Sequence, residues 1–186
     1  RHHAQEGVVE AVEVMRRVNE IMIPIEQYPS VRDNATLREA IAKIEEAHLE
    51  VRLRKSLPRV LLVFDEINVL VGTVRRRDIM RGLEPKYLLS KPLEYKKKLF
   101  DIDIDPNLAE LSYDRVVRGI REQANRPVSD VMSPIEAILD AEDHVMKAVQ
   151  AMVALDVSLV PVLQNGQLVG VVRSVEAFRE LAQLVR

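Results

Sequence analysis

Two short stretches of this sequence place the same three kinds of residue at the same spacing. Each has a glycine, an arginine three positions later and an acidic residue three positions after that, in the order Gly72, Arg75, Asp78 and again Gly170, Arg173, Glu176. A guanidinium binds a phosphate or a carboxylate through two parallel hydrogen bonds. The repeated pattern therefore suits recognition of a small anionic molecule.

The elements that position these residues are a short apolar strand and the helix that follows it. We expect strands over 69–74 and 168–172, followed by helices over 76–83 and 174–185. The acid lies in the first turn of each helix, where the helix dipole favours negative charge. The first turn also leaves N–H groups unpaired, and the adjacent arginine adds positive charge. Such a junction can bind an anion if a cleft lies beside it.

The same residues also have explanations that need no ligand. Asp78 gains about 0.3–1 kcal/mol from the helix dipole alone. The run from Arg75 to Arg77 opposes that dipole, so a phosphate or a neighbouring acidic side chain should compensate it. Solvated surface arginines are a further alternative. Arg75 and Arg173 can equally fill the space beside them by forming salt bridges.

The composition limits the classes of protein that this chain can belong to. Of its 186 residues 47% are hydrophobic and 30% are charged, as in soluble globular domains. The net charge of −2 gives no basic field for nucleic acid, and the apolar runs are too short for membrane insertion. Without cysteine the chain fits a reducing compartment, so we expect it to be cytoplasmic.

A second repeated motif divides the chain into two copies of one unit. Met22-Ile23-Pro24 returns 110 positions later as Met132-Ser133-Pro134, whereas the glycine motif returns after 98, so the first copy holds an insertion. We expect each copy to run strand, helix, strand, strand, helix, in a mixed α/β fold. The predicted boundaries are an N-terminal helix in 1–17, repeats in 18–83 and 128–186, and a mostly helical insertion in 84–127.

Local signals predict the elements inside each repeat. In the first, a strand over 27–31 precedes a helix that starts at the capping box Thr36 to Glu39 and continues toward Lys55. In the second, Asp143 should cap the corresponding helix. Asn68 and Asn165-Gly166 should form the hairpin turns because they tolerate positive φ.

The remaining segments have weaker signals. Apolar spacing predicts one amphipathic helix over 8–22 and another over 107–124. Lys96 to Lys98 reads as a solvated face. No nucleophile motif, P-loop or metal-ligand spacing is present, so we expect no enzyme activity and no metal. A weaker alternative is an enzyme that holds a metal at the acidic stretch Asp101 to Asp105.

With two copies in register, the chain resembles a tandem pair of cystathionine-β-synthase (CBS) domains, often called a Bateman module. The resemblance covers 18–83 and 128–185 and rests on the doubled Met-x-Pro, the order of elements, Pro161 before a turn and the glycine motifs. It implies two repeats packed about a pseudo-twofold axis, with a cleft between their sheets. It also implies a homodimer that binds ATP, ADP, AMP or S-adenosylmethionine, without an obligatory cofactor, and regulates a partner enzyme or transporter.

The resemblance also implies roles for individual residues. The family's aspartate holds the ribose hydroxyls, and this position is Asp78 in the first copy and Glu176, one methylene longer, in the second. The family's Thr/Ser position near the phosphate is Arg75 or Arg173 here, a departure from the pattern. The predicted ligand-binding residues are Gly72, Thr73, Arg75, Arg76, Asp78, Pro161, Gly170, Arg173, Ser174 and Glu176. The alternative function is a dimerisation scaffold whose clefts bind no nucleotide.

Overall fold

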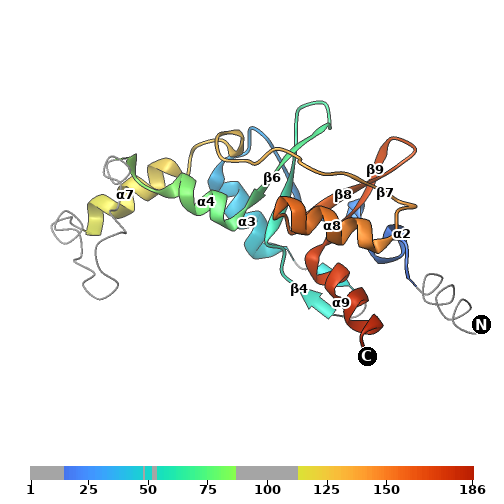
Figure 1. Cartoon of the computed structure of the whole chain (residues 1–186). Coiled ribbons are helices and arrows are strands. Elements are labelled where there is room, and N and C mark those ends of the chain that lie inside the picture. The colour runs from blue at the N-terminus through green and yellow to red at the C-terminus, as the bar shows by residue number, and fades with distance from the viewer. Residues whose placement is uncertain (1–14, 48, 52–53, 87–112) are drawn as a thin grey trace, which may run out of the picture. The chain divides into compact units, whose positions relative to one another are not determined.

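A computed structural model describes residues 15–47, 49–51, 54–86 and 113–186 of the chain (Figure 1). These residues form a mixed α/β structure, which confirms the predicted fold class. The chain divides into two compact units. Unit 1 contains Arg1–Pro29, His48–Ser56 and Pro134–Arg186, and unit 2 contains Ser30–Ala47 and Leu57–Ser133. Each unit therefore combines segments from both sequence repeats.

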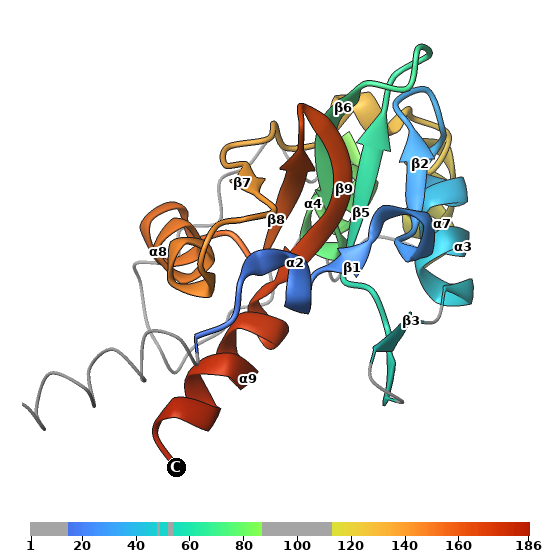
Figure 2. The ribbon, with the colours of Figure 1, turned by 90° about the vertical axis from the view of Figure 1, so that its right-hand side faces the viewer.

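Unit 1 is built on a four-stranded sheet in the order β1-β9-β8-β7 (Figure 2). Its strands are β1 (Ile23–Pro24), β7 (Leu139–Asp140), β8 (Leu159–Gln164) and β9 (Gln167–Arg173). Its helices are α2 (Val18–Ile21), the 3-10 turn η1 (Ile25–Gln27), α8 (Val145–Leu155) and α9 (Ser174–Leu184). The buried core joins α2 to the second repeat, because Val18 and Ile21 pack with Leu139, Val160 and Val172.

Unit 2 is built on a three-stranded sheet in the order β2-β5-β6. Its strands are β2 (Ser30–Arg32), β5 (Val60–Phe64) and β6 (Leu70–Arg75). Its helices are α3 (Leu37–Glu46), α4 (Arg76–Leu83), α7 (Tyr113–Gln123) and the 3-10 turn η2 (Val128–Asp130). Val128 and Val131, which open the second repeat, are buried in this core with Leu37, Leu61 and Val74.

The two sheets have the same pattern of one parallel strand pair and one antiparallel hairpin. β2 and β5 are parallel, as are β7 and β8, and a helix connects the strands of each pair. β5–β6 and β8–β9 are antiparallel hairpins. Asn68, Asn165 and Gly166 have positive φ angles, which confirms the predicted turn residues.

Each repeat lends its Met-x-Pro segment to the sheet of the other repeat. In unit 1, Ile23 and Pro24 pair antiparallel with Val171 and Gly170 of β9. In unit 2, Ser133 makes the equivalent bridge to Thr73 of β6. The N–H of Thr73 donates to the Ser133 carbonyl at 2.9 Å, and the N–H of Ser133 donates back at 2.8 Å. Within each unit, the repeated motif is therefore an edge segment from one sequence repeat on a sheet formed by the other.

The first long helix of unit 2 is shorter than predicted. Thr36 caps α3 as expected, with its hydroxyl accepting from the Glu39 N–H at 3.1 Å. The helix ends at Glu46, however, and does not continue toward Lys55. The hairpin of β3 (Leu49–Val51) and β4 (Arg54–Ser56) follows. The sequence from Leu49 to Arg54 alternates apolar and charged residues, a period of two that favours strands over a helix.

Two further details of the predicted helices are wrong. Residue His144, not Asp143, is the N-cap of α8, since its backbone is extended and the helix begins at Val145. The Val145 N–H donates to the Arg16 carbonyl at 3.1 Å. The predicted helix over 8–22 is not continuous. Arg17 is extended and forms a β-bridge with His144, so only α2 is helical in its described part.

Several predicted features lie outside the described residues. They are residues 1–14, the first part of the 107–124 helix, Lys96 to Lys98 and Asp101 to Asp105. The end of the insertion is described, and α7 and its following turn belong to unit 2. In the described ranges no helix combines the length and apolar character needed to span a bilayer.

Candidate functional site

The first predicted site lies where β6 of unit 2 passes directly into α4. Arg75 ends the strand with extended backbone angles and is the N-cap of the helix. Asp78, in the first turn, accepts from the Arg75 backbone N–H at 2.9 Å. Asp78 is fully buried. The carboxylate therefore closes the start of the helix on its own N-cap residue, as the dipole favours.

The Asp78 carboxylate is also the centre of an ion-pair cluster. Its Oδ2 accepts from Arg75 Nε at 3.0 Å, and its Oδ1 accepts from Arg75 Nη2 at 2.9 Å and from Arg81 Nη2 at 3.3 Å. Burial alone would raise the pKa of Asp78, but the hydrogen bonds from Arg75 and the charges of Arg75 and Arg81 outweigh it and lower the pKa. Asp78 is therefore ionised at neutral pH.

The equivalent junction of unit 1, between β9 and α9, has the same pairing. Arg173 Nε donates to Glu176 at 2.9 and 3.1 Å, and Nη2 donates to the same carboxylate. Glu176 is buried, and so is the neighbouring Tyr28. Burial raises the pKa of the Tyr28 hydroxyl far above its usual value; the Arg173 charge lowers it and the Glu176 charge raises it. The pair thus lies beside a neutral phenol.

The two junctions differ in exposure and in charge. The Arg75 side chain is 41% exposed, whereas that of Arg173 is 12% exposed. The sequence from Arg75 to Arg81 has four arginines and one aspartate, whereas the equivalent stretch from Arg173 to Arg179 has two arginines and one glutamate, followed at once by Glu180. The junction of unit 2 is therefore the more open and the more cationic of the two.

The repeated glycines have a structural role that sequence reasoning missed. A Cβ on Gly72 would lie 2.6 Å from the Ser133 carbonyl oxygen, and a Cβ on Gly170 would lie 2.6 Å from that of Ile23. These oxygens belong to the backbone and cannot move aside easily. Glycine is therefore required where the edge segment of the other repeat crosses the strand. The occurrence of both the Met-x-Pro motif and the glycine in each copy is the signal that could have indicated this contact.

The other predicted residues fall into two groups, one in each unit. Thr73 and Arg76 lie at the junction of unit 2, and the Arg76 N–H donates to the Arg59 carbonyl at 3.3 Å. Ser174 lies at the junction of unit 1, with its N–H bonded to the Ser158 carbonyl at 2.8 Å. Pro161 is buried in β8 opposite Val171 and lies apart from the ion pair along the hairpin.

Sequence reasoning also missed two side chains beside the ion pairs. Arg81 contacts Asp78, and its spacing of three residues on a helix places it on the same face. Tyr28 reaches the second junction from the first repeat, which no local pattern indicates. Among the described residues no group of three or more acidic or histidine side chains could hold a metal ion.

As it stands, each junction presents a guanidinium held in place by its own helix. The two Asp78 oxygens accept four hydrogen bonds, about the capacity of a carboxylate. Asp78 can accept from a ribose hydroxyl only after a guanidinium has moved away. The arginines, in contrast, are donors suited to a phosphate.

Comparisons with known proteins agree with this architecture. The model of the CBS domain family matches residues 18–85 and 128–183, about two thirds of the chain. No curated protein matches. The CBS domain of a CBS domain-containing membrane protein from Sphaerobacter thermophilus has a TM-score of 0.62 at 19% identity, covering 96% of this chain and 97% of that one.

Two further solved structures are similar over most of their length. CBSX2, a CBS-pair protein from Arabidopsis thaliana solved in complex with AMP, has a TM-score of 0.57 at 17% identity, covering 91% of this chain and 98% of that one. The CBS domain of the bacterial CNNM/CorC family Mg2+ transporter has a TM-score of 0.57 at 16% identity, and the match covers 97% of this chain and 85% of that one. At these identities the likeness shows the fold. With both repeats matched by the family model, the chain belongs to the CBS domain family.

Proposed function

We propose that this chain is a regulatory module, not an enzyme, that binds an adenine nucleotide at the junction of β6 and α4. The observation that carries the proposal is the partly exposed Arg75 at the N-cap of α4, a helix that itself contains three more arginines. The AMP complex of CBSX2 supports the ligand class, since that protein has the same fold. Bound nucleotide would alter how the module engages a partner enzyme or transporter.

The charge at this junction favours one class of adenosyl ligand over another. Residues 75–81 include four arginines and a single aspartate, and two of the arginines, Arg75 and Arg81, contact that aspartate. ATP, ADP and AMP carry phosphate charges that these guanidiniums complement. S-adenosylmethionine has a cationic sulfonium and an ammonium group. We therefore expect anionic nucleotides to bind more tightly than S-adenosylmethionine.

Binding at this site needs only a local rearrangement. If the Arg75 side chain turns to a phosphate, Asp78 keeps Arg81 and the Arg75 backbone N–H as partners. The buried carboxylate would not be left without compensation, which is the condition that makes breaking an ion pair costly. Each Asp78 oxygen would keep one donor, and the acceptor positions that the Arg75 side chain leaves would then accept from a ribose hydroxyl.

We place the ligand in unit 2 and assign the pair in unit 1 a structural role. Arg173 and Glu176 are both nearly covered, and the buried Tyr28 lies beside them. Moving Arg173 would remove its hydrogen bonds from the buried Glu176 carboxylate, which costs free energy. Asp78, in contrast, keeps the Arg81 side chain and the Arg75 backbone N–H as donors. The two junctions would thus have diverged in function while keeping one geometry.

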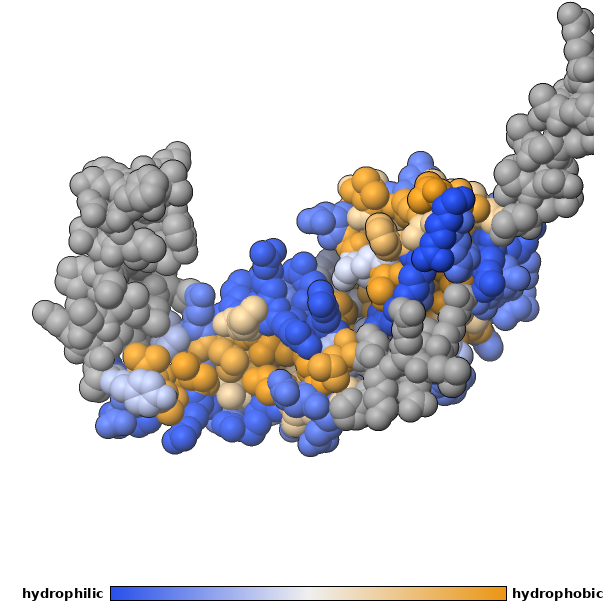
Figure 3. Space-filling view, turned by 90° about the horizontal axis from the view of Figure 1, so that it is seen from below, coloured by the Kyte–Doolittle hydropathy of each residue, from blue (hydrophilic) through white to orange (hydrophobic). Residues whose placement is uncertain are grey.

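A homodimer completes the proposal. Large apolar side chains are exposed in unit 1, among them Val153 on α8, Phe178 on α9 and Val185 just after α9. Apolar areas are visible among the charged residues in Figure 3. A second copy that covered such side chains would remove them from water.

A dimerisation scaffold without nucleotide is the second candidate. Arg75 and Arg173 each pair with a carboxylate of the helix that follows them, and this favours the scaffold. The carboxylate neutralises part of the positive charge that would attract a phosphate. In that case the arginines fill the space that a nucleotide would take.

Calorimetric titration and thermal unfolding of the full chain with ATP, ADP, AMP and S-adenosylmethionine would distinguish these functions. At about 100 times Kd, a bound nucleotide should raise Tm by roughly 5–10 °C. Arg75→Gln should weaken nucleotide binding at least about tenfold, a loss of about 1.4 kcal/mol. If none of the four ligands binds and the chain sediments as a dimer, the scaffold is the function.

Arg173→Gln is the matched control, because it makes the same change at the equivalent position of the other repeat. We expect this variant to lose stability and to keep the wild-type affinity for nucleotide. Circular dichroism at the titration temperature confirms that each variant is folded. A loss of affinity in Arg173→Gln but not in Arg75→Gln would move the site to unit 1.

A further inference from the structure

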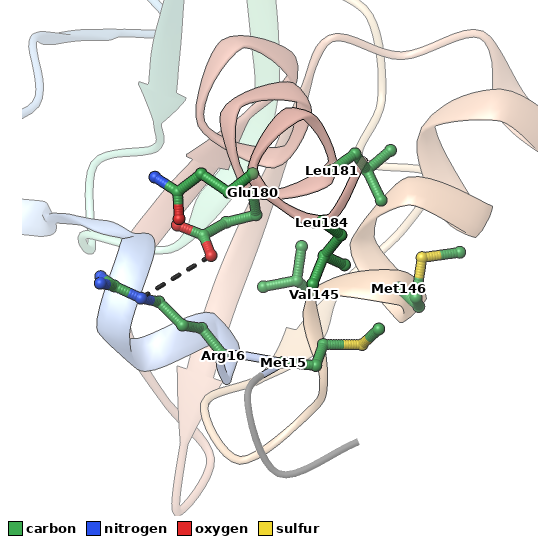
Figure 4. A pocket seen from close by; sticks show the side chains of 8 residues that line it. Met15, Arg16, Val145, Met146, Glu180, Leu181 and Leu184 are labelled. Atoms are coloured by element: carbon green, nitrogen blue, oxygen red, sulfur yellow. Dashed lines mark ion pairs between the residues drawn. The ribbon is translucent and has the colours of Figure 1, made fainter. Parts of the chain in front are cut away.

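Unit 1 has a pocket that neither junction uses. It lies between the start of α8 and the last turns of α9, and Met15 and Arg16 form its third wall (Figure 4). Its volume is about 200 Å³. The apolar side chains that line it are Met15, Val145, Met146, Leu181 and Leu184.

The lining and the size of this pocket indicate the kind of group that it takes. The charged lining residues, Arg16 and Glu180, face each other at 3.7 Å across one edge (Figure 4). The rest of the wall is mostly aliphatic and contains two methionines, which adapt to irregular apolar groups. Small-molecule sites usually measure about 300–1,000 Å³. The pocket is thus suited to aliphatic side chains and too small for a nucleotide.

The chain itself supplies such side chains at the entrance of the pocket. Residues 1–14 precede Met15, which already contributes to the wall. The segment 8–14, Val-Val-Glu-Ala-Val-Glu-Val, has five apolar residues among seven. The β-bridge of Arg17 with His144 and the bond from the Val145 N–H to the Arg16 carbonyl fix the chain beside the first turn of α8.

A segment tethered at the pocket has an advantage over any free partner. Short flexible connections give effective concentrations in the millimolar range. Seven residues of segment 8–14 can reach about 10 Å as a helix or more than 20 Å when extended, enough to lie across the ends of α8 and α9. Neither a second copy nor another protein is held so close.

We propose that segment 8–14 is the occupant of this pocket and inserts valine side chains between Met146 and Leu184. This inference is independent of the proposed nucleotide site, which lies in the other unit. The apolar residues of segment 8–14 would then serve to dock this segment onto its own chain. The apolar part of α8 that it covers is Met146, whereas Val153, two turns further along α8, stays exposed.

The absence of cysteine from the chain allows a direct test by thiol alkylation. Met146→Cys places a thiol at the pocket, and Val153→Cys places one on the same helix at a position that is 78% exposed. Each is combined with Val8→Asp/Val12→Asp in the full chain. We expect alkylation of Met146→Cys to become about tenfold faster with the aspartates, as for a docking free energy of about 1.4 kcal/mol. Alkylation of Val153→Cys should not change.

The remaining outcomes overturn the proposal. Equal rates for Met146→Cys with and without the aspartates would show that the segment does not cover the pocket. Protection that falls when the protein is diluted would identify a second copy as the occupant, because intramolecular docking does not depend on concentration. Circular dichroism of each variant confirms that unit 1 remains folded.

Discussion

Asp78 shows how one buried residue can stabilise a helix start and bias a ligand site. Its carboxylate accepts from the Arg75 backbone and from two guanidiniums. The same contacts that lower its pKa hold Arg75 in a fixed orientation at the surface. Stability and ligand recognition therefore depend on the same carboxylate, so a change at Asp78 should affect both.

The lowered pKa of Asp78 predicts a specific dependence of stability on pH. Its contribution is complete above the unfolded pKa of about 3.9 and is lost as the pH falls through the lower folded pKa. Asp78→Asn should cost about 1–3 kcal/mol at pH 7, because hydrogen bonds to a charged group are lost. The difference from wild type should shrink as the pH falls from 5 to 3, measured by urea unfolding.

Glu66→Gln, at an exposed hairpin tip, is the control for this series. It should follow the wild-type curve at every pH. If Asp78→Asn keeps a constant difference from wild type down to pH 3, the ionised carboxylate is not the source of the stability.

At the scale of elements, the crossing segments explain why the two repeats need each other. Ser133 pairs with β6, and Ile23 pairs with β9, each through the backbone. The glycine opposite each segment lets the two backbones approach closely. The contact depends on backbone geometry, so the identity of the side chain at Ser133 matters little.

Two substitutions of Ser133 should differ in their effect on the free energy of unfolding. Ser133→Pro removes the N–H that donates to the Thr73 carbonyl and should lower the free energy of unfolding by about 1–3 kcal/mol. Ser133→Ala keeps that N–H and should change it by less than about 0.5 kcal/mol. Urea unfolding of both variants measures the contrast. Equal losses would mean that the hydroxyl, not the backbone pairing, holds the segment.

At the scale of the whole molecule, the boundary between the sequence repeats is not a boundary between folded units. A cut after Pro127 would remove Val128 and Val131 from the core of unit 2. The same cut would leave the second half without Val18 and Ile21, which are buried in unit 1. Neither half retains a complete core.

We therefore expect fragments 1–127 and 128–186 to be unfolded alone and to fold when mixed. Each lost core residue costs about 1.5–3 kcal/mol, so the loss of two exceeds much of the stability of a small domain. Circular dichroism melts of each fragment and of an equimolar mixture test this. A sharp cooperative transition in either fragment alone would show that the exchanged segments are dispensable.

Local sequence signals determined most of the secondary structure. The start of α4 at Arg76 and the start of α9 at Ser174 follow from the end of an apolar strand and an acid in the first turn. The turns at Asn68 and Asn165-Gly166 follow from residues that tolerate positive φ. The prediction failed at the end of α3. The helix was expected to continue toward Lys55, but residues 49–54 alternate apolar and charged residues, and β3 and β4 form a hairpin.

The candidate site was only partly predictable. The arginine and the acid of each copy are three residues apart on one helix start, so their pairing was an alternative that the sequence already allowed. The greater positive charge of the first copy was visible in the sequence. The difference in arginine exposure was not, and neither was Tyr28, which reaches the second junction from the first repeat. A side chain that arrives from a distant segment leaves no local periodicity.

The sequence by itself determined that this chain contains two copies of one α/β unit, because the same motifs recur in the same order in both halves. The tertiary structure alone decided that each Met-x-Pro segment completes the sheet of the other copy. It also decided which guanidinium is open to solvent. The physical reason is that backbone pairing and burial are made between residues about 60 to 150 positions apart, and such long-range contacts are not encoded in any local pattern.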